Sequence, residues 1–514
     1  MSKTIIIIGA GLAGLSAALQ AAENGCNVKL VSSLPSERAQ SVMAEGGINA
    51  ALNTKDENDS PEEHFTDTIK AACGLADPNA VWGMTQAAPE LVHWLLKLGV
   101  KFNMSGYDDV DLRNFGGQKK KRTAFAQSDT GKQIMTAMID AVRRKEASGM
   151  VERFSHHSFL TLRLCGNICC GCVIRDEYSQ ETVELPGDAV IVATGGMHGL
   201  FGNTTGSLSN TGEVTAELFR LGVPLANGEM IQYHPTTVKC GGKRMLISEA
   251  ARGEGGRLFA MKDGKQWYFM EEKYPELGNL MPRDITAREI WKVSHESEVF
   301  LDMTEISEEI ISNKLSGLAD DCMTYLHKDI RKEPVSVLPG IHYFMGGILV
   351  DEQHRTPIQN LCAAGECCAQ YHGANRLGGN SLLGALYGGR VAAKSACEQA
   401  DVVDLSCATQ IDFPPASQIS EIKQLNKVMQ ETMGVVRNEN MLLNGIKTVQ
   451  ALTGNLPLLG MAVLKSALAR KESRGAHWRE DYPKSNDDDY LKTTVARFDG
   501  KQIQISFVPV PERR

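Results

Sequence analysis

Hydrophobic residues near the start of the chain follow a strand–helix–strand order. Thr4–Ile8 is a continuous apolar and β-branched run that predicts a buried parallel strand, and Leu15–Asn24 and Asn27–Ser32 predict a helix and a second strand. Two later apolar runs, Ala189–Ala193 and Leu361–Ala364, predict further buried strands. Because parallel strands connected by helices build sheets that are covered on both faces, this order predicts an α/β fold.

The other segments show helical or alternating patterns. Ser60–Lys101 and Ile419–Lys471 predict helices, whereas Phe154–Tyr178 alternates apolar and polar residues and predicts short strands. The last segment, Glu472–Arg514, is charged and predicts mainly loop, with strand character at Gln502–Val510.

Composition narrows the class of protein. The chain has 514 residues, 42% of them hydrophobic and 23% charged, which is typical of a globular protein of about three domains. A net charge of -8 argues against nucleic acid as a partner. No stretch has the roughly 20 uninterrupted apolar residues of a membrane span, so we expect a soluble chain.

The 13 cysteines are scattered and many lie in apolar runs. This usage is typical of reduced thiols and predicts a cytoplasmic protein. Cys169 and Cys172 form a C-x-x-C pair, but without a second pair we interpret them as packed thiols and predict no metal site.

A glycine motif follows the first strand. Gly9, Gly11 and Gly14 stand in G-x-G-x-x-G spacing with Ala10 between the first two, which predicts a tight turn and a helix N-terminus facing the pyrophosphate of a dinucleotide. At the end of the second strand, Ser32 stands where an acidic residue usually meets the ribose, and its hydroxyl can also bond a ribose oxygen. These residues alone leave NAD and FAD both open.

Two further motifs favour FAD. Ala193, Thr194 and Gly195 after the third strand resemble the second glycine motif of FAD-dependent oxidoreductases. Glu366, after the fourth, resembles the acid that binds the ribityl chain in that family, although it can also be a neighbour of a helix N-cap.

The segment His372–Leu382, with the sequence HGANRLGGNSL, closely resembles the signature of succinate dehydrogenase and fumarate reductase flavoproteins, and it leads into an apolar run that predicts a helix over Leu382–Gln399. The resemblance extends over almost the whole chain and keeps the family's order of motifs. These motifs are Ala44–Gly47, Gln232–Thr236, Glu249–Gly256, Pro282–Asp284, His342–Gly347 and Glu472–His477.

The resemblance implies a Rossmann-like FAD-binding domain with an inserted α+β capping domain and a C-terminal helical domain. We predict that the FAD-binding domain is discontinuous and comprises residues 1–227 and 345–406. The capping domain would comprise 228–344 and the C-terminal domain 415–514, after a linker at Cys407–Ser417.

The substrate implied by the resemblance is a C4 dicarboxylate, fumarate or succinate. Arg376 can clamp a carboxylate with two hydrogen bonds, and His234, His342 and Ser248 can donate to carboxylate oxygens. Phe115 is also expected at the substrate. By the same resemblance, Ser41, Glu45, Gly46, Gly47, Glu213, Ser381 and Leu382 are expected to bind the flavin.

Reduction of a C=C bond requires a hydride on one carbon and a proton on the other. The resemblance implies that flavin supplies the hydride and that Arg283 is the proton donor, with Glu249 and Arg252 as its proton relay. A carboxylate beside the arginine and the charge that develops on the substrate can make this transfer feasible.

Some residues depart from the family pattern. Gln40 stands where most membrane-bound members have the histidine that bonds covalently to the flavin, so we predict noncovalent FAD and expect fumarate reduction to be favoured. Ser248 replaces a threonine, Glu213 an aspartate, and Phe344 a threonine whose replacement by a ring can reshape the pocket.

Other functions stay open at this point. L-aspartate oxidase is the main rival interpretation, but Glu45 stands where that enzyme typically has glutamine, and Phe115 where it typically has a glutamate for the substrate amine. A reductase of another activated alkene carboxylate and a noncatalytic electron carrier are further alternatives. The resemblance implies an iron–sulfur subunit as partner, with a membrane-anchor subunit as a further candidate. The chain would then lie at the cytoplasmic face of a membrane.

Overall fold

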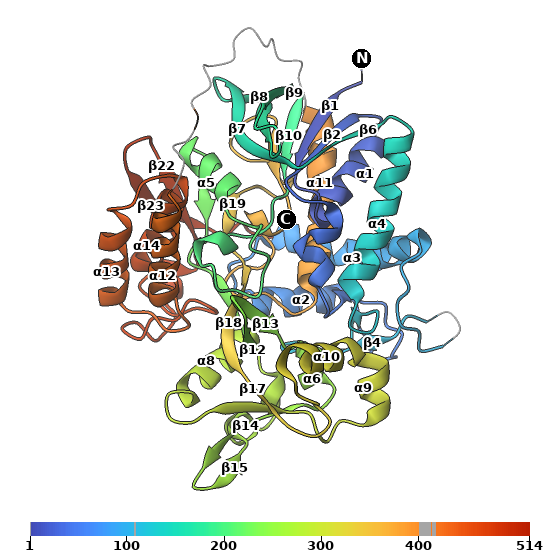
Figure 1. The fold of residues 1–514 in the computed structure, drawn as a ribbon, viewed down its shortest axis with the longest axis vertical. Coiled ribbons are helices and arrows are strands. Elements are labelled where there is room, and N and C mark those ends of the chain that lie inside the picture. The colour runs from blue at the N-terminus through green and yellow to red at the C-terminus, as the bar shows by residue number, and fades with distance from the viewer. Residues whose placement is uncertain (1, 107–108, 400–412, 414–417) are drawn as a thin grey trace.

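The computed structural model describes residues 2–106, 109–399, 413 and 418–514 (Figure 1). Its central feature is a five-stranded parallel sheet in the order β20-β10-β1-β2-β6. The strands predicted from the apolar runs are confirmed within one residue at their ends. The bounds are β1 (Thr4–Ile8), β2 (Asn27–Ser32), β6 (Val151–Ser155), β10 (Ala189–Val192) and β20 (Leu361–Ala363).

Alternate residues of β1 face two different cores. Ile5 and Ile7 pack against helices on one face, whereas Ile6 and Ile8 pack on the other face against a three-stranded sheet. The strand is therefore apolar throughout, as a doubly covered strand must be. The covering helices are α1 (Leu12–Glu23), α4 (Thr130–Ala147) and α11 (Asn380–Gln399), and the covering strands are β7 (His157–Cys165), β8 (Ile168–Asp176) and β9 (Thr182–Pro186).

The predicted helical region after residue 60 is confirmed as two helices. They are α2 (Pro61–Ala71) and α3 (Pro78–Leu98), and each begins with a proline preceded by a capping side chain, Ser60 or Asp77. Gly99 ends α3 with a φ of 101°, a conformation that favours glycine. The small sheet beside them contains β3 (Ile48–Asn49), β4 (Leu112–Arg113) and β5 (Thr123–Ala124).

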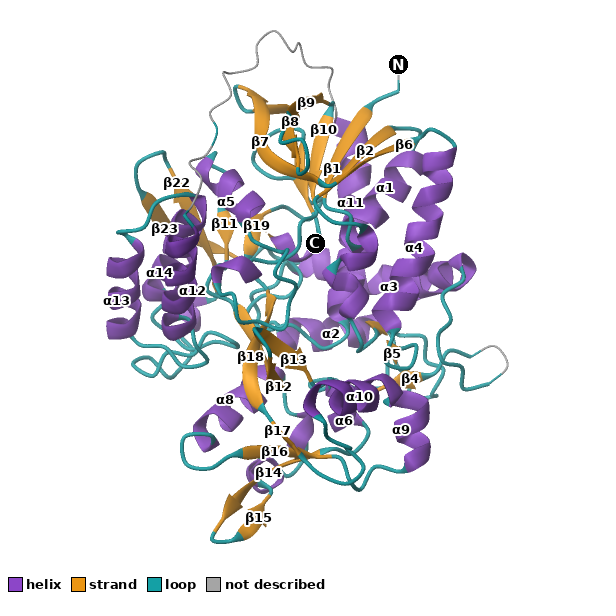
Figure 2. Cartoon of the chain, viewed as in Figure 1, coloured by secondary structure: helices purple, strands orange, loops and turns teal. Residues whose placement is uncertain are grey.

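Residues between the two parts of the nucleotide-binding fold form a separate α+β lobe at the bottom of Figure 2. Strands β12 (Ile231–Cys240) and β18 (Leu338–Phe344) pair antiparallel and connect this lobe to the rest of the chain. Its other elements are β13 (Lys243–Leu246), α6 (Glu249–Gly253), β14 (Arg257–Lys262), β15 (Lys265–Trp267), α7 (Phe269–Lys273), α8 (Arg283–Val293), β16 (Val299–Asp302), α9 (Glu308–Lys314), α10 (Ser316–Asp321) and β17 (Val335–Ser336).

The C-terminal part contains the predicted helices but differs from the prediction in its tail. The helices are α12 (Ile419–Thr432), α13 (Glu439–Val449) and α14 (Asn455–Ala469). The tail does not remain mainly loop: β22 (Lys492–Phe498) and β23 (Ile503–Pro509) form a hairpin, and β22 pairs with β11 (Leu225–Ala226). The sheet order is β21-β19-β11-β22-β23. Remaining elements are α5 (Glu213–Arg220), β19 (Gly347–Leu349), β21 (Cys368–Ala369) and α15 (Asp487–Tyr490).

Strand β22 was missed because its pattern is weak, with charged residues at Lys492 and Arg497 and two threonines. Pairing between Leu225 and Ala496 supplies the stabilisation that local sequence does not show. The α/β class with a C-terminal helical part is confirmed, whereas the domain boundaries stay a prediction. Of the predicted linker Cys407–Ser417, all but Phe413 lies outside the described residues.

Candidate active site

A cavity of about 1190 Å³ runs from the carboxyl ends of the parallel strands to the α+β lobe. One part is lined by the glycine turn and Ser32, and another by His234, Arg283, His342 and Arg376. Ligands of open α/β sheets bind at this edge of the sheet. The predicted cofactor and substrate residues therefore share one continuous space.

Most of the predicted site residues line this cavity. Those that do are Gly9, Ala10, Gly11, Ser32, Ser41, Glu45, Gly46, Gly47, Phe115, Ala193, Thr194, Gly195, Glu213, His234, Ser248, Glu249, Arg283, His342, Glu366, Arg376, Ser381 and Leu382, together with Gln40. Gly14 and Arg252 lie behind the lining. Gly14 is needed for packing instead, because a Cβ there would lie 1.8 Å from the carbonyl oxygen of Gly9.

The glycine turn brings α1 end-on to the cavity. Gly9 has a φ of 112°, and a Cβ on it would lie 2.2 Å from the carbonyl oxygen of Ala193. Gly11 has no side chain to cap the helix, and the N–H of Leu12 donates to Oγ of Ser41 at 3.3 Å, which leaves the N–H groups of Ala13 and Gly14 for an anionic group. Among the described residues, the buried Ser32 Oγ has no hydrogen-bond partner. Both features fit a pyrophosphate and a ribose.

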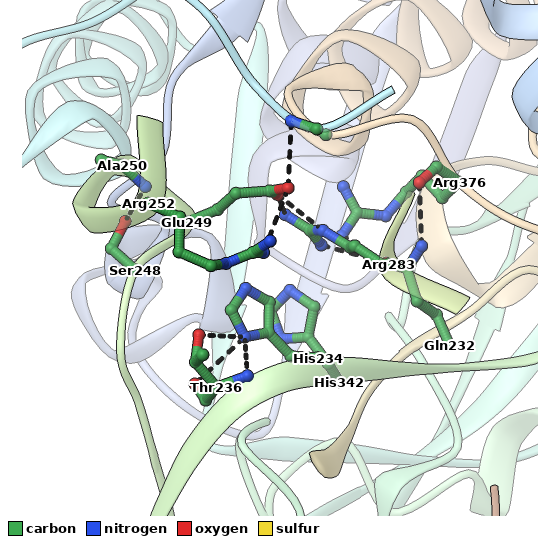
Figure 3. A network of polar contacts seen from close by, with 12 residues as sticks. Gln232, His234, Thr236, Ser248, Glu249, Ala250, Arg252, Arg283, His342 and Arg376 are labelled. Carbon is green, nitrogen blue, oxygen red and sulfur yellow. Dashed lines mark hydrogen bonds and ion pairs between the residues drawn. The ribbon is translucent and has the colours of Figure 1, made fainter. Parts of the chain in front are cut away.

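Arg283 is the centre of a buried hydrogen-bonded cluster (Figure 3). It begins α8, and its Nε and Nη2 donate to Oε2 of Glu249 at 2.8 and 2.5 Å. The other carboxylate oxygen, Oε1, accepts from the backbone N–H of Gly116 at 3.1 Å and lies 3.3 Å from Nη2 of Arg252. Arg252, Glu249 and Arg283 thus form one connected chain of ionisable groups.

The charges of this cluster favour an anionic ligand. Burial raises the pKa of Glu249, but the guanidiniums of Arg283 and Arg252 outweigh it and hold this pKa below its usual value. With Arg376, three guanidiniums face one carboxylate, so these four residues carry an excess of two positive charges. A dicarboxylate with two negative charges would balance that excess.

Gln232, which was not predicted as a site residue, connects Arg283 and Arg376. Its Oε1 accepts from Nη1 of Arg283 and from Nη2 of Arg376, both at 3.0 Å. Its Nε2 donates to Oδ1 of Asn375 at 2.9 Å and to the backbone oxygen of Arg376 at 2.8 Å. Gln232 lies in the same sequence motif as His234, and this position was the available signal for it. A motif does not show, however, which groups the side-chain amide contacts.

The two histidines come from paired strands, β12 and β18. The rings of His234 and His342 lie edge to face with centroids 5.1 Å apart. Nδ1 of His342 contacts the hydroxyl of Thr205 at 2.8 Å, and Nδ1 of His234 contacts the backbone of Thr236. Burial, followed by the charge of Arg283, lowers both histidine pKa values well below their usual value, so both rings are neutral hydrogen-bond partners.

The remaining predicted residues shape the cavity around this cluster. Ser248 caps α6, where its Oγ accepts from the backbone N–H of Ala250 at 3.4 Å. Phe115 is 2% exposed and packs close to Gly46 and Gly378. It therefore supplies an apolar wall between the glycine motif of the flavin end and the signature loop.

Phe344 is not among the residues that line the cavity, and the effect of its ring on pocket shape stays a prediction. The ring is 1% exposed and packs against His198 and Phe201 in the adjoining core. Only its backbone N–H reaches the site, where it donates to Oε1 of Glu366 at 3.0 Å. Any residue other than proline can make that contact.

Comparisons with known proteins agree with this geometry. The family described as FAD binding domain matches residues 4–382, and the family described as fumarate reductase flavoprotein C-term matches residues 452–513. The chain is 38% identical to the succinate dehydrogenase flavoprotein subunit of Bacillus subtilis, and the alignment covers 100% of this chain and 98% of that relative.

This chain belongs to the flavoprotein-subunit family of succinate dehydrogenases and fumarate reductases. It is 32% identical to the 8-methylmenaquinol:fumarate reductase flavoprotein subunit of Wolinella succinogenes, with 100% of this chain and 92% of the relative covered. The solved FrdA chain of Escherichia coli quinol fumarate reductase has a TM-score of 0.90 at 27% identity, with 99% and 97% of the two chains covered.

As a member of this family, the chain is an FAD-dependent oxidoreductase, and its residues fit that cofactor. The N–H groups of Ala13 and Gly14 at the helix N-terminus suit the pyrophosphate, the unpaired Ser32 hydroxyl suits the ribose, and Glu366 also lines the cavity. Among the described residues, no helix is both long and apolar enough to cross a membrane.

Proposed function

We propose that this chain reduces fumarate to succinate with noncovalently bound FAD, as the flavoprotein subunit of a larger complex. The observation that carries this proposal is the position of Arg283. It lies in the cavity between Glu249 and Gln232, it shares the Gln232 oxygen with Arg376, and that cavity is continuous with the dinucleotide end.

The residues of the chain would bind the two ends of fumarate differently. Arg376 is buried and its Nε has no partner among the described residues, so this N–H can donate to a substrate carboxylate. Nε2 of His234 is likewise buried without a partner in the part of the chain that the structure describes, and it carries the ring's proton in the tautomer whose Nδ1 accepts from the backbone N–H of Thr236. These donors would hold the dicarboxylate across the cavity, with its C=C bond beside Arg283.

Bound FAD supplies the hydride that adds to one alkene carbon. Arg283 donates the proton that the other carbon takes up. The ionised Glu249, in contact with Arg283 and near Arg252, then takes a proton from Arg252 and passes it to the guanidinium, and Arg252 regains its own proton from solvent at the outer end of the relay. Burial of the three side chains keeps water away from the proton path. The positive excess stabilises the negative charge that develops on the substrate.

Gln40 supports the noncovalent attachment, because it lines the cavity with a carboxamide that cannot form the family's histidyl bond. In the family, that bond raises the flavin potential and supports succinate oxidation, so its absence favours fumarate reduction. A dye-coupled assay tests the direction: we expect faster fumarate reduction with reduced viologen than succinate oxidation with an oxidising dye. The opposite ratio would overturn the proposed direction.

An iron–sulfur subunit is the proposed electron donor, with a membrane-anchor subunit as a further candidate partner that would hold the complex at the cytoplasmic face of a membrane. The support is that the relatives reported above are named as subunits. Purification of the native complex should yield a second, iron-containing chain. A lone chain that reduces fumarate at full rate with a soluble donor would contradict this assembly.

A further inference from the structure

The amide of Gln232 has only one useful orientation. Its oxygen must face Arg283 and Arg376, because guanidiniums only donate hydrogen bonds. Its nitrogen then faces the Asn375 oxygen and the backbone oxygen of Arg376, which only accept. A rotation of the amide by 180° would place N–H groups against both guanidiniums and oxygen against oxygen.

Asn375 is a second amide with the same requirement. It presents Oδ1 to Gln232 only if its Nδ2 points the other way, and there Nδ2 donates to Oδ1 of Asp284 at 2.9 Å. An ionised carboxylate accepts hydrogen bonds and cannot donate one. Asp284 therefore excludes the alternative orientation of Asn375, and Asn375 in turn excludes that of Gln232.

We propose that Asp284 is a positioning residue that orders the Asn375 and Gln232 amides in series, so that one oxygen holds both Arg283 and Arg376 for catalysis. The inference rests on the proposed function, because it assigns a role within the same reaction. Asp284 follows Arg283 directly, at the start of α8, while Asn375 precedes Arg376 in the signature loop. The series thus ties the proton donor and the carboxylate clamp to each other from two separate segments.

The position of Asp284 favours its ionised form. It lies in the first turn of α8, where the helix dipole stabilises negative charge. Arg288 is on the same helix four residues later, and its guanidinium stacks on the ring of Trp478 with 4.1 Å from Cζ to the ring centroid. Burial raises the pKa of Asp284, but the charge of Arg288 and backbone N–H groups oppose that rise.

The first test is the Asp284→Asn variant, whose side chain has the same shape but can donate as well as accept. Asn375 can then rotate and turn its Nδ2 toward Gln232, which removes one of the four contacts that hold the Gln232 amide and loosens the acceptor that both arginines share. We expect kcat for fumarate to fall about tenfold and KM to rise, as for one misdirected hydrogen bond to a charged group. Flavin content and Tm should stay at wild-type values.

The matched control is Asp263→Asn, at the exposed turn of the β14–β15 hairpin. It should leave kcat and KM unchanged.

A double variant separates ordering from general structural support. In Gln232→Glu, the group between Arg283 and Arg376 is a carboxylate, and both of its oxygens are acceptors. Asn375 must then rotate so that its Nδ2 donates to this carboxylate. Adding Asp284→Asn lets position 284 donate to the rotated Asn375. We expect the double variant to be at least as active as Gln232→Glu alone. If Asp284→Asn lowers kcat by the same factor in both backgrounds, Asp284 acts independently of the amides and the inference fails.

The two proposals fail in different ways. A wild-type protein that binds FAD but does not reduce fumarate would overturn the proposed function. A wild-type protein that turns over fumarate, with Asp284→Asn unchanged in both kcat and KM, would overturn only the positioning role. A fall in kcat that is matched by lost flavin, at unchanged KM, would also overturn that role, because it reports less folded enzyme.

Discussion

At the scale of single residues, the site depends on charges that are buried and paired. Glu249 satisfies Arg283 and approaches Arg252, so Arg283 is held in place by its partners with only 7% of its surface exposed. The sequence predicted these three residues because they fall in two of the family's motifs, Glu249–Gly256 and Pro282–Asp284. It did not predict Gln232, Asn375 or Asp284. The role of an amide depends on which partners its oxygen and its nitrogen face, and the role of Asp284 depends on the amide beside it. These contacts exist only in the folded chain.

Replacement of Arg283 by lysine keeps the positive charge but removes the fork that contacts Glu249 and Gln232. If Arg283 is the proton donor, fumarate turnover should fall by about 10²–10⁴-fold, the usual contribution of general acid–base catalysis. The protein should remain yellow, with wild-type flavin content. A steady-state assay and a flavin spectrum measure both properties, and near-normal turnover would show that the proton comes from another group.

Glu45 gives a prediction for pH. Burial, followed by the charge of Asp321, raises the pKa of Glu45 to about 8, and Arg113 and Ser248 oppose the shift only in part. The folded protein therefore keeps a proton that the unfolded chain releases near 4.5, the ordinary pKa of a glutamate, so this residue makes the free energy of unfolding fall as pH rises from about 4.5 to 8. Glu45→Gln, which cannot ionise, should have a Tm advantage over the wild type that grows across this range. A Tm difference that is the same at pH 5 and pH 8 would contradict the assignment.

At the scale of elements, the C-terminal helices and hairpin are joined to the start of the α+β lobe. The side chains of Arg470 and Glu229 are both fully buried, and Arg470 Nε donates to Oε1 of Glu229 at 2.7 Å. Arg470 also donates to Glu472 and to the hydroxyl of Thr494 in β22. Glu229 lies two residues before β12, the strand that carries Gln232 and His234. The C-terminal part therefore supports the strand that presents half of the site.

Arg470→Ala leaves Glu229 buried without its paired cation and leaves Glu472 with Arg474 alone. We expect the free energy of unfolding to fall by about 3–5 kcal/mol, as for other broken buried ion pairs. The exposed pair Arg355–Asp351 is the control, and Arg355→Ala should cost about 0–1 kcal/mol. Urea unfolding of the flavin-loaded protein measures both values. If the two substitutions lower the free energy of unfolding equally, the conclusion that Arg470 stabilises the start of β12 is contradicted.

At the scale of the whole molecule, one cavity links three regions that are distant in the sequence. The sheet and its glycine turn could be predicted because strand, turn and helix are adjacent in the chain and their pattern is local. The pairing of β22 with β11 could not, because it joins residues about 270 positions apart and leaves no periodic signal of its own. The clamp residues could be predicted from motifs, while their mutual contacts required the fold.

Acid precipitation tests how the whole protein holds its cofactor. With Gln40 in the cavity, all of the flavin should appear in the supernatant and none with the precipitated chain. Flavin that stays bound to the chain after acid and denaturant would contradict noncovalent attachment. The absorbance spectrum of each fraction decides between the two outcomes.

The most direct measurement is the rapid mixing of anaerobically reduced protein with fumarate, followed by flavin absorbance. We expect the oxidised spectrum to return fully in the wild type and far more slowly in Arg283→Lys, with succinate formed in equal amount to the flavin oxidised. We also expect no flavin reduction when L-aspartate is mixed with the oxidised protein. A flavin that stays reduced in the presence of fumarate would contradict the central claim that this cavity holds and protonates a C4 dicarboxylate.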